Sequence, residues 1–567
     1  MTAVLLCADL ETLGWGIDLA AVVAWLEVAI PAVRPRIVPA LCDRLAHATA
    51  HLPREGPDRL VLGLCARPRA RAEFQAHVRR AGIDPLTVET VDLGTYAARA
   101  HPRPRATDTA RVLLAGAVAR ARAALPSRPE HVRLVVPRAT SRRALFRLAW
   151  HEYESIPAAA PDRCRADRGC AQCAQSCPRG ALAIVDGTVE LDRSACTRCG
   201  ICVTACPHEA MELPGAMPAQ VEAQVAALLH AAPGALGPRG IAFTCQHDGR
   251  HHGGTRTASA RAATAPAPGW LPVEVPCVAM VPPTWVLAAV AMGAASVALL
   301  PAPDGCPDGT ADAVAGRVAY CRALLRALGD PDERVVCGHA VGPSGHREER
   351  RALGDPDERV AALPAHGPWP RALPDAPPPP HPSAPGVEAA FAHHARARVL
   401  AHLRARRARL DVRAVAHPHS PFGLVTAAPG CTLCGACAAA CPAGALLLQH
   451  DGTGATLHFA AARCTSCGLC LPACPEPGVL ALARITDLQR LCSGPVVLAR
   501  SAHRRCAACG APFAVEAMAA KVAALLGEAS PAVRRVARLC PACRPVAIGS
   551  APDGPGPPLP DTAREIR

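Results

Sequence analysis

The stretch that decides the fold of this chain is Cys431-Thr-Leu-Cys-Gly-Ala-Cys-Ala-Ala-Ala-Cys-Pro442, whose cysteines are spaced C-x2-C-x2-C-x3-C-P. The same spacing recurs in the runs that begin at Cys464 and Cys196, and a fourth run with a longer first gap begins at Cys164. The four runs contain sixteen of the 29 cysteines in the 567-residue chain. These are Cys164, Cys170, Cys173, Cys177, Cys196, Cys199, Cys202, Cys206, Cys431, Cys434, Cys437, Cys441, Cys464, Cys467, Cys470 and Cys474. Such repetition indicates one kind of site built four times.

This spacing is typical of bacterial ferredoxins, in which three thiolates of a run bind one [4Fe–4S] cluster and the fourth reaches a second cluster. Disulfides and zinc sites have no reason to repeat it. Crossed ligation predicts three complete ligand sets. They are Cys431, Cys434, Cys437 with Cys474; Cys464, Cys467, Cys470 with Cys441; and Cys196, Cys199, Cys202 with Cys177. The sequence therefore predicts two ferredoxin modules and four [4Fe–4S] clusters. Within the first module, residues 181–191 predict a hairpin that turns at Asp186-Gly187.

The remaining set is irregular. It contains Cys170, Cys173 and Cys206, but Asp167 occupies the expected first position, and Cys164 lies three residues before it. Three alternatives follow: a longer loop brings Cys164 to the cluster, Asp167 supplies an oxygen, or the cluster contains three irons. A soft thiolate suits iron–sulfur chemistry better than a hard carboxylate, which favours Cys164.

The C-terminal region carries two further C-x2-C pairs, Cys506/Cys509 and Cys540/Cys543. Four thiolates in a tetrahedral array suit zinc or a single iron. Because Phe513 is the only aromatic residue between the pairs, the aromatic core typical of a rubredoxin is missing. We expect a structural zinc hook, with a single iron or no metal as alternatives, and an alanine-rich helix over residues 514–526.

Composition excludes several classes of function. The net charge is +14, but aromatic residues make up only 3%, so the basic surface lacks the aromatic interleaving of a nucleic-acid-binding face. The apolar stretch Trp285–Leu300 is short for a membrane span and predicts a buried helix, a turn at Gly293 and a strand. No dinucleotide or phosphate-loop motif is present, and catalytic residues are unknown. So many thiols need a reducing compartment, which predicts the cytoplasm.

Residues 1–95 alternate strands with helices expected over residues 19–30, 41–52 and 69–81, which predicts a parallel sheet. A further helix is expected over residues 141–150. Cys7, Cys42 and Cys65 follow predicted strand ends, where ligands bind in such sheets. These thiols either hold a metal or cluster or simply pack well. Strands over residues 241–244, 273–275, 296–300 and 335–336 predict a second sheet of this kind.

The predicted fold class is α/β plus α+β multidomain. It comprises two small parallel-sheet α/β domains, two ferredoxin-like 2[4Fe–4S] modules and the zinc-hook segment. The expected boundaries are 1–105 (α/β), 106–160 (connection), 161–213 (first ferredoxin module), 214–340 (second α/β), 341–420 (Pro/Ala/Arg-rich linker), 421–482 (second ferredoxin module), 483–550 (zinc hook) and 551–567 (disordered tail).

The first α/β segment resembles the amino-terminal region of the A subunit of heterodisulfide reductase. The resemblance rests on Cys7, Leu41-Cys42 and Leu60-Val-Leu-Gly-Leu-Cys-Ala-Arg-Pro-Arg69, followed by Phe74. The flavin-binding core of that family is absent.

The second α/β segment resembles the delta subunit of methyl-viologen-reducing hydrogenases, through Ile241-Ala-Phe-Thr-Cys245, Val275-Pro-Cys277 and residues 288–295. That family binds a [2Fe–2S] cluster with cysteines at these strand ends. Here the opening Cys-x2-Cys reads Cys245-Gln-His-Asp248, so one thiol is lost. Three matching thiols remain (Cys245, Cys277 and Cys306), with Cys321 or Cys337 as a possible fourth. The segment either binds an additional cluster or serves as a docking surface.

These resemblances imply an electron-transfer component of an oxidoreductase complex. The expected partners are redox proteins of the hydrogenase, heterodisulfide reductase or formate dehydrogenase type, with no nucleic acid and no membrane span. Two alternatives remain: an oxidoreductase with its own substrate site at the Cys7/Cys42/Cys65 edge, and a redox-sensing or assembly scaffold.

Overall fold

The computed structural model divides the chain into two compact units, residues 1–421 with 484–492 and residues 422–483 with 493–567. Its described residues are 1–12, 16–43, 45–52, 56–65, 71–101, 105–135, 152–231, 236–245, 267–301, 310–338, 394–406, 414–526 and 531–549. The helix expected near residues 141–150 and the tail expected at 551–567 lie outside these ranges. No helix among the described residues is both long and apolar enough to cross a membrane.

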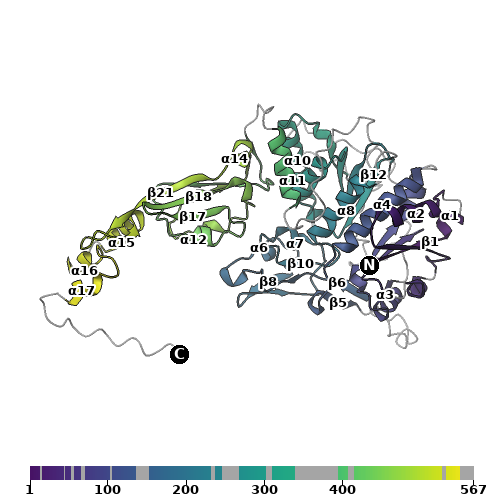
Figure 1. Cartoon of the computed structure of the whole chain (residues 1–567), viewed down its shortest axis with the longest axis horizontal. Coiled ribbons are helices and arrows are strands. Elements are labelled where there is room, and N and C mark those ends of the chain that lie inside the picture. Colours follow the sequence, from purple (N-terminus) through teal and green to yellow (C-terminus); the bar gives the residue numbers. More distant parts are fainter. Residues whose placement is uncertain are drawn as a thin grey trace, which may run out of the picture. The chain divides into compact units, whose positions relative to one another are not determined.

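The first unit begins with a four-stranded parallel sheet of order β2-β1-β3-β4, as the alternation of elements predicts. Figure 1 labels its strand β1 and the nearby helices α2 and α3. Its strands are β1 (Thr2–Cys7), β2 (Val33–Val38), β3 (Arg59–Leu64) and β4 (Glu89–Asp92). The helices α2 (Leu19–Ala29) and α3 (Arg71–Arg80) match expected helices. The helix expected over residues 41–52 is instead a short 3-10 helix, Leu45–His51. Every residue of β1 is buried, because both faces of a parallel sheet are covered.

Sequence reasoning missed α4 (Arg105–Arg122), which lies in the segment expected to be a connection. Arginines near its ends flank an apolar centre in which every residue from Val112 to Val118 is buried. It packs against α2 and lies beside α8 (Pro218–His230) (Figure 1). Gly116 permits this close approach, since a Cβ there would lie 2.8 Å from a methyl carbon of Leu228.

A second parallel sheet, β12-β11-β13-β14, repeats the strand order of the first. Its strands are β11 (Gly240–Cys245), β12 (Trp270–Val275), β13 (Ser296–Leu300) and β14 (Val335–Cys337). The apolar stretch forms α9 (Pro283–Ala291), a turn in which Gly293 has φ 97°, and β13, as predicted. Helix α10 (Ala311–Ala327) precedes β14.

The first ferredoxin module lies in the same unit. It contains α6 (Gln172–Gln175), the hairpin β8 (Leu182–Val185) and β9 (Thr188–Leu191), α7 (Ile201–Ala205), and the pair β7 (Ala158–Ala159) and β10 (Met211–Glu212). The predicted hairpin turn has positive φ at both Asp186 and Gly187, as a two-residue turn of this hand requires. A further hairpin, β5 (Val132–Val135) with β6 (Glu152–Ser155), precedes the module.

The expected linker contributes packed elements to the first unit from residue 394 onward. Helix α11 (His394–Arg406) contacts α9 and α14 (Leu488–Cys492), and β15 (Ala414–Ala416) pairs with β20 (Ile485–Asp487). The hydroxyl groups of Tyr320 on α10 and Thr486 on β20 lie 2.7 Å apart in a hydrogen bond, which links this strand to α10.

The second unit widens the hairpin of the second ferredoxin module into an antiparallel sheet, β17-β18-β21-β22. Its strands are β17 (Leu446–His450), β18 (Gly454–Phe459), β21 (Val496–Arg505) and β22 (Pro512–Val515). The unit also contains the pair β16 (Leu424–Ala427) and β19 (Leu480–Ala483), and the helices α12 (Ala436–Ala439), α13 (Cys470–Ala473), α15 (Glu516–Leu525), α16 (Pro531–Val536) and α17 (Arg544–Gly549). The long strand β21 leads directly to Cys506.

Candidate cluster-binding sites

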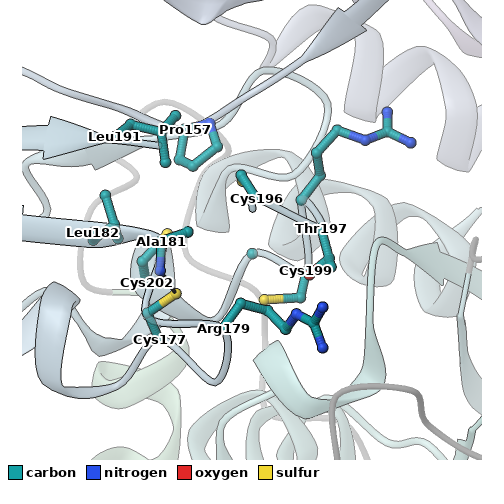
Figure 2. A pocket seen from close by; sticks show the side chains of 12 residues that line it. Pro157, Cys177, Arg179, Ala181, Leu182, Leu191, Cys196, Thr197, Cys199 and Cys202 are labelled. Carbon is teal, nitrogen blue, oxygen red and sulfur yellow. Dashed lines mark hydrogen bonds between the residues drawn. The ribbon is translucent and has the colours of Figure 1, made fainter. Parts of the chain in front are cut away.

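One pocket of the first unit is lined by four thiols, Cys177, Cys196, Cys199 and Cys202 (Figure 2). They are the set that crossed ligation predicts for this module. Pro157, Leu182 and Leu191 form an apolar wall around the pocket (Figure 2). Burial raises the pKa of Cys202 well above its usual range, and the neighbouring thiols, Cys199 first, add to the shift. Four soft donors around one partly apolar hollow suit an iron–sulfur cluster.

The loops that present these thiols share an unusual backbone. Arg198, Leu433 and Ser466 occupy the same place before the second cysteine of their runs, and their φ angles are 61°, 57° and 59°. The glycine two residues later also has positive φ in each run, as at Gly200 with 80°. Side chains other than glycine rarely adopt this conformation, and such strain gathers at functional sites. The repeated geometry therefore belongs to ligand presentation rather than to chance.

The irregular set is also brought together. Burial raises the pKa of Cys173 to about 11, and the nearby thiols of Cys206, Cys170 and Cys164 contribute to that shift. Asp167, by contrast, packs its backbone against the β8–β9 turn, where a Cβ on Gly187 would lie 3.1 Å from the Asp167 Cα. This placement favours Cys164 over Asp167 as the first donor of the set.

The second unit shows the same crossing. Burial and the thiols of Cys431, Cys434 and Cys474 raise the pKa of Cys437 to about 11. Burial and the thiols of Cys464, Cys467 and Cys441 raise the pKa of Cys470 to about 12. In both sets one buried thiol therefore lies close enough to the other three to be affected by their charges.

The cysteines that precede proline differ in their hydrogen bonds. Cys177, Cys206 and Cys441 each accept the backbone N–H of the alanine four residues later, at 3.3, 3.3 and 3.2 Å. Cys474 is followed by Pro-Glu-Pro-Gly instead, and its Sγ lies 3.5 Å from the carbonyl oxygen of Glu476. Hydrogen bonds to sulfur are one means by which a protein adjusts a cluster's potential, so this ligand is set apart from the other three.

The first module also contains a charged network that sequence reasoning missed. Glu154 is buried, and its carboxylate oxygens lie 2.6 Å from Arg133 and 3.3 Å from Arg198. Arg133 also donates to the backbone carbonyl of Cys196 at 3.1 Å. Arg198 lies within a cysteine run, which was the available signal, but Arg133 and Glu154 come from the β5–β6 hairpin well before it.

The C-terminal region gathers its four predicted thiols. The Sγ atoms of Cys506, Cys509, Cys540 and Cys543 all lie within 4.8 Å of one another, and those of Cys509 and Cys540 are 3.7 Å apart. A tetrahedral ion with metal–sulfur bonds of about 2.3 Å requires sulfur separations of about 3.8 Å. Backbone N–H groups, that of Cys540 first, lower the pKa of Cys506 to about 6.

The thiols at the edge of the first sheet converge as well. The Sγ atoms of Cys7, Cys42 and Cys65 lie within 4.8 Å of one another, and the Cys65 N–H donates to the Cys42 Sγ at 3.1 Å. Hydrogen bonds from Cys42 and Cys65 lower the pKa of Cys7. The prediction that these three thiols converge is confirmed, but their arrangement does not identify what they bind.

The cysteines of the second sheet are placed differently. Cys245 ends β11 and accepts the Val278 N–H at 3.2 Å, while Cys277 accepts the Ala279 N–H at 3.4 Å. Cys321 is buried on α10, Cys337 ends β14, and Cys306 lies outside the described residues. Among the described residues, three or more ligand atoms lie close together in two groups, the four C-terminal thiols and the thiols of Cys7, Cys42 and Cys65. The described cysteines of the second sheet form no such group.

Comparisons with known proteins match three parts of this chain. Residues 430–477 match the 4Fe-4S dicluster domain and residues 189–212 the 4Fe-4S binding domain. Residues 241–363 match the delta subunit of methyl-viologen-reducing hydrogenase. The chain therefore contains iron–sulfur-binding domains and a domain similar to that hydrogenase component. The resemblance of the first α/β segment to heterodisulfide reductase stays a prediction.

Two curated relatives match short stretches. The chain is 44% identical over 45 residues to the B subunit of the ion-translocating oxidoreductase complex of Methanosarcina acetivorans. It is 43% identical over 53 residues to formate hydrogenlyase subunit 2 of Escherichia coli. These stretches cover 8% and 9% of this chain, and 17% and 26% of the relatives.

Proposed function

We propose that this chain is an electron-transfer protein that holds four [4Fe–4S] clusters and relays electrons between redox partners. The observation that carries the proposal is the pocket in which Cys177 meets Cys196, Cys199 and Cys202. The other sets are Cys164, Cys170, Cys173 with Cys206; Cys431, Cys434, Cys437 with Cys474; and Cys464, Cys467, Cys470 with Cys441. A bound cluster supplies reversible one-electron storage, and each module seats two clusters as neighbours.

The protein's own groups adjust that chemistry. Apolar side chains such as Leu182 and Leu191 limit water around the thiolates, and backbone N–H groups donate to the sulfurs of Cys177, Cys206 and Cys441. Arg133 and Arg198 bring two positive charges against the single carboxylate of Glu154, which leaves an excess positive charge beside the pocket. Positive charge and hydrogen bonds to sulfur both favour the reduced state.

We infer the kind of partner from the comparisons. The hydrogenase delta-subunit match and the two relatives, each named as one component of a larger enzyme, point to redox proteins of the hydrogenase, heterodisulfide reductase or formate dehydrogenase type. The number of free thiols that must remain reduced favours a cytoplasmic location. Co-purification of the tagged full chain under anaerobic conditions tests this, and recovery of only non-redox proteins would contradict it.

Metal analysis tests the central proposal. Anaerobically purified chain should contain sixteen irons and sixteen inorganic sulfides, as four cubane clusters require, and reduction with dithionite should produce electron paramagnetic resonance signals of interacting pairs. Colourless protein with far fewer than sixteen irons, even after reconstitution, would contradict it.

We also propose that the C-terminal thiols bind one structural zinc. The sulfur separations support a single ion, and the exposed Cys509 and the aromatic neighbour Phe513, the one aromatic residue between the pairs, suit a metal without redox chemistry better than iron. The Cys506→Ser/Cys509→Ser chain should lose one zinc and keep its sixteen irons. Cys492→Ser, outside the thiol groups described above, is the matched control and should keep both. A seventeenth iron in place of zinc would refute the assignment.

The convergent thiols Cys7, Cys42 and Cys65 favour a second candidate, an oxidoreductase whose substrate binds at that sheet edge. Purified chain that reduces a disulfide or quinone without a partner, with the activity abolished by Cys7→Ser, would support it. Equal turnover by Cys7→Ser would exclude it.

A further inference from the structure

The chain contains one lysine, Lys521, among 567 residues whose other basic side chains are arginines and histidines. Lys521 lies on α15 of the C-terminal region, and its Nζ lies 2.8 Å from Oε2 of Glu476. The Glu476 side chain is only 14% exposed, while that of Lys521 is 46% exposed. The ion pair therefore joins the C-terminal region to the second ferredoxin module across 45 residues of chain.

Glu476 occupies a special place in that module. It follows Cys474 by two residues, and the Cys474 Sγ contacts its carbonyl oxygen. In the other three runs the alanine four residues after the cysteine donates its N–H to the sulfur, as Ala445 does to Cys441. Cys474 thus has a carbonyl contact at its sulfur and a carboxylate-bearing residue two positions after it.

We propose that Lys521 neutralises Glu476 and thereby sets the reduction potential of the cluster held by Cys431, Cys434, Cys437 and Cys474. This inference rests on the proposed function. A carboxylate that is mostly withdrawn from water opposes the arrival of an electron nearby, because little solvent screens it. The ammonium group at 2.8 Å cancels most of that field. Lys521 is a positioning residue, since it acts through Glu476.

An ordinary surface ion pair would contribute little to stability. The proposal therefore predicts a redox effect that stability measurements would miss. Lys521→Met should lower one of the four midpoint potentials and leave the other three in place. The expected shift is a several-fold change in the reduction equilibrium, and a tenfold change would correspond to about 59 mV for one electron.

Charge variants separate this mechanism from a structural one. Glu476→Gln should raise the same midpoint potential, because it leaves the Lys521 ammonium group uncompensated. Lys521→Arg keeps the positive charge and should leave the midpoint potential at its original value. The double variant Glu476→Gln/Lys521→Met should lie between the single variants, as a direct pair requires. Arg504→Met is the matched control. It removes a cation from the other ion pair of α15, Arg504 with Glu516, and should move no midpoint.

Because the chain has a single lysine, chemical modification can remove the Lys521 charge without a substitution at Lys521 or Glu476. Acetylation with an N-hydroxysuccinimide ester would reach two amines, Lys521 and the Met1 amine that pairs with Asp58. Acetylation removes the charge and should reproduce the Lys521→Met shift, whereas reductive methylation keeps the charge and should not. Acetylated Lys521→Arg chain, modified at Met1 alone, should show no shift.

The measurement is a potentiometric titration of full-length chain, followed by electron paramagnetic resonance, with iron content determined on each sample. Four unchanged midpoints in Lys521→Met chain that retains sixteen irons would overturn the inference and leave the proposed function intact. Unaltered chain without clusters would instead overturn the proposed function. Equal shifts in Lys521→Met and Lys521→Arg would show a packing effect and also overturn the inference.

Discussion

The two ferredoxin modules carry the same cysteine pattern in different surroundings. The first belongs to the unit that contains both parallel sheets, and its cysteine loop contacts the Arg133–Glu154–Arg198 network and Met280, whose Sδ would lie 2.7 Å from a Cβ on Gly200. The second shares an antiparallel sheet with the C-terminal region, and its charged neighbours are Glu476 and Lys521. The cysteine pattern selects the cofactor, and the surroundings adjust its potential and its access.

The largest expected effect concerns the irregular run, which only the first module has. Cys164→Ser should lose the iron of one cluster, about four of sixteen, or convert that cluster to a three-iron form, because a ligand is removed. Asp167→Asn should keep all sixteen irons. Iron analysis with electron paramagnetic resonance checks both, and the reverse result would make Asp167 the donor.

A smaller effect is expected from the buried network of the first module. Glu154→Gln should lower the free energy of unfolding by about 3 kcal/mol, because two arginines lose their carboxylate partner in a partly buried place. Denaturant unfolding of the cluster-loaded chain measures this. The exposed acid Glu130, at the start of a nearby 3-10 helix, provides Glu130→Gln as a control with little effect. Equal losses of unfolding free energy in the two variants would show that the Glu154 network does not stabilise the first module.

Glycine substitutions compare the two modules at one loop position. Gly200 and Gly468 have φ of 80° and 78°, so alanine at either site costs about 1–2 kcal/mol in backbone strain. At Gly200 the new Cβ also meets Met280, which adds about 1 kcal/mol or more, while at Gly468 the nearest atom is 4.0 Å away. The melting temperature of Gly200→Ala should therefore be lower than that of Gly468→Ala. Equal melting temperatures would mean that Met280 moves freely.

The smallest effect is expected from Arg198, whose place is taken by Leu433 and Ser466 in the other runs. Arg198→Leu removes a positive charge beside the pocket, so it should lower the midpoint potential of that cluster a few-fold in reduction equilibrium. Redox titration against the unaltered chain checks this. A rise in the midpoint would show that Glu154, and not the arginine, dominates the local field.

The sequence predicted what depends on short-range pattern. The cysteine runs, the Asp186-Gly187 hairpin and the strand after Gly293 are local signals, and the structure contains both the hairpin and the strand. Helix α4 escaped notice because its arginine-rich ends conceal an apolar centre. The ion pairs of Glu154 and Glu476 could not be predicted, because their partners become neighbours only when separate elements pack together.

The strand β21 has a mechanical consequence. Its ten residues span about 33 Å, pair with β18 of the second ferredoxin module's hairpin from Val496 to Ala502, and end next to Cys506. Because the same strand pairs with the hairpin and leads to Cys506, a protein bound at the C-terminal thiols lies at a fixed distance from the second ferredoxin module. A longer β21 would therefore increase the distance between a protein bound at the C-terminal thiols and the clusters of the second ferredoxin module.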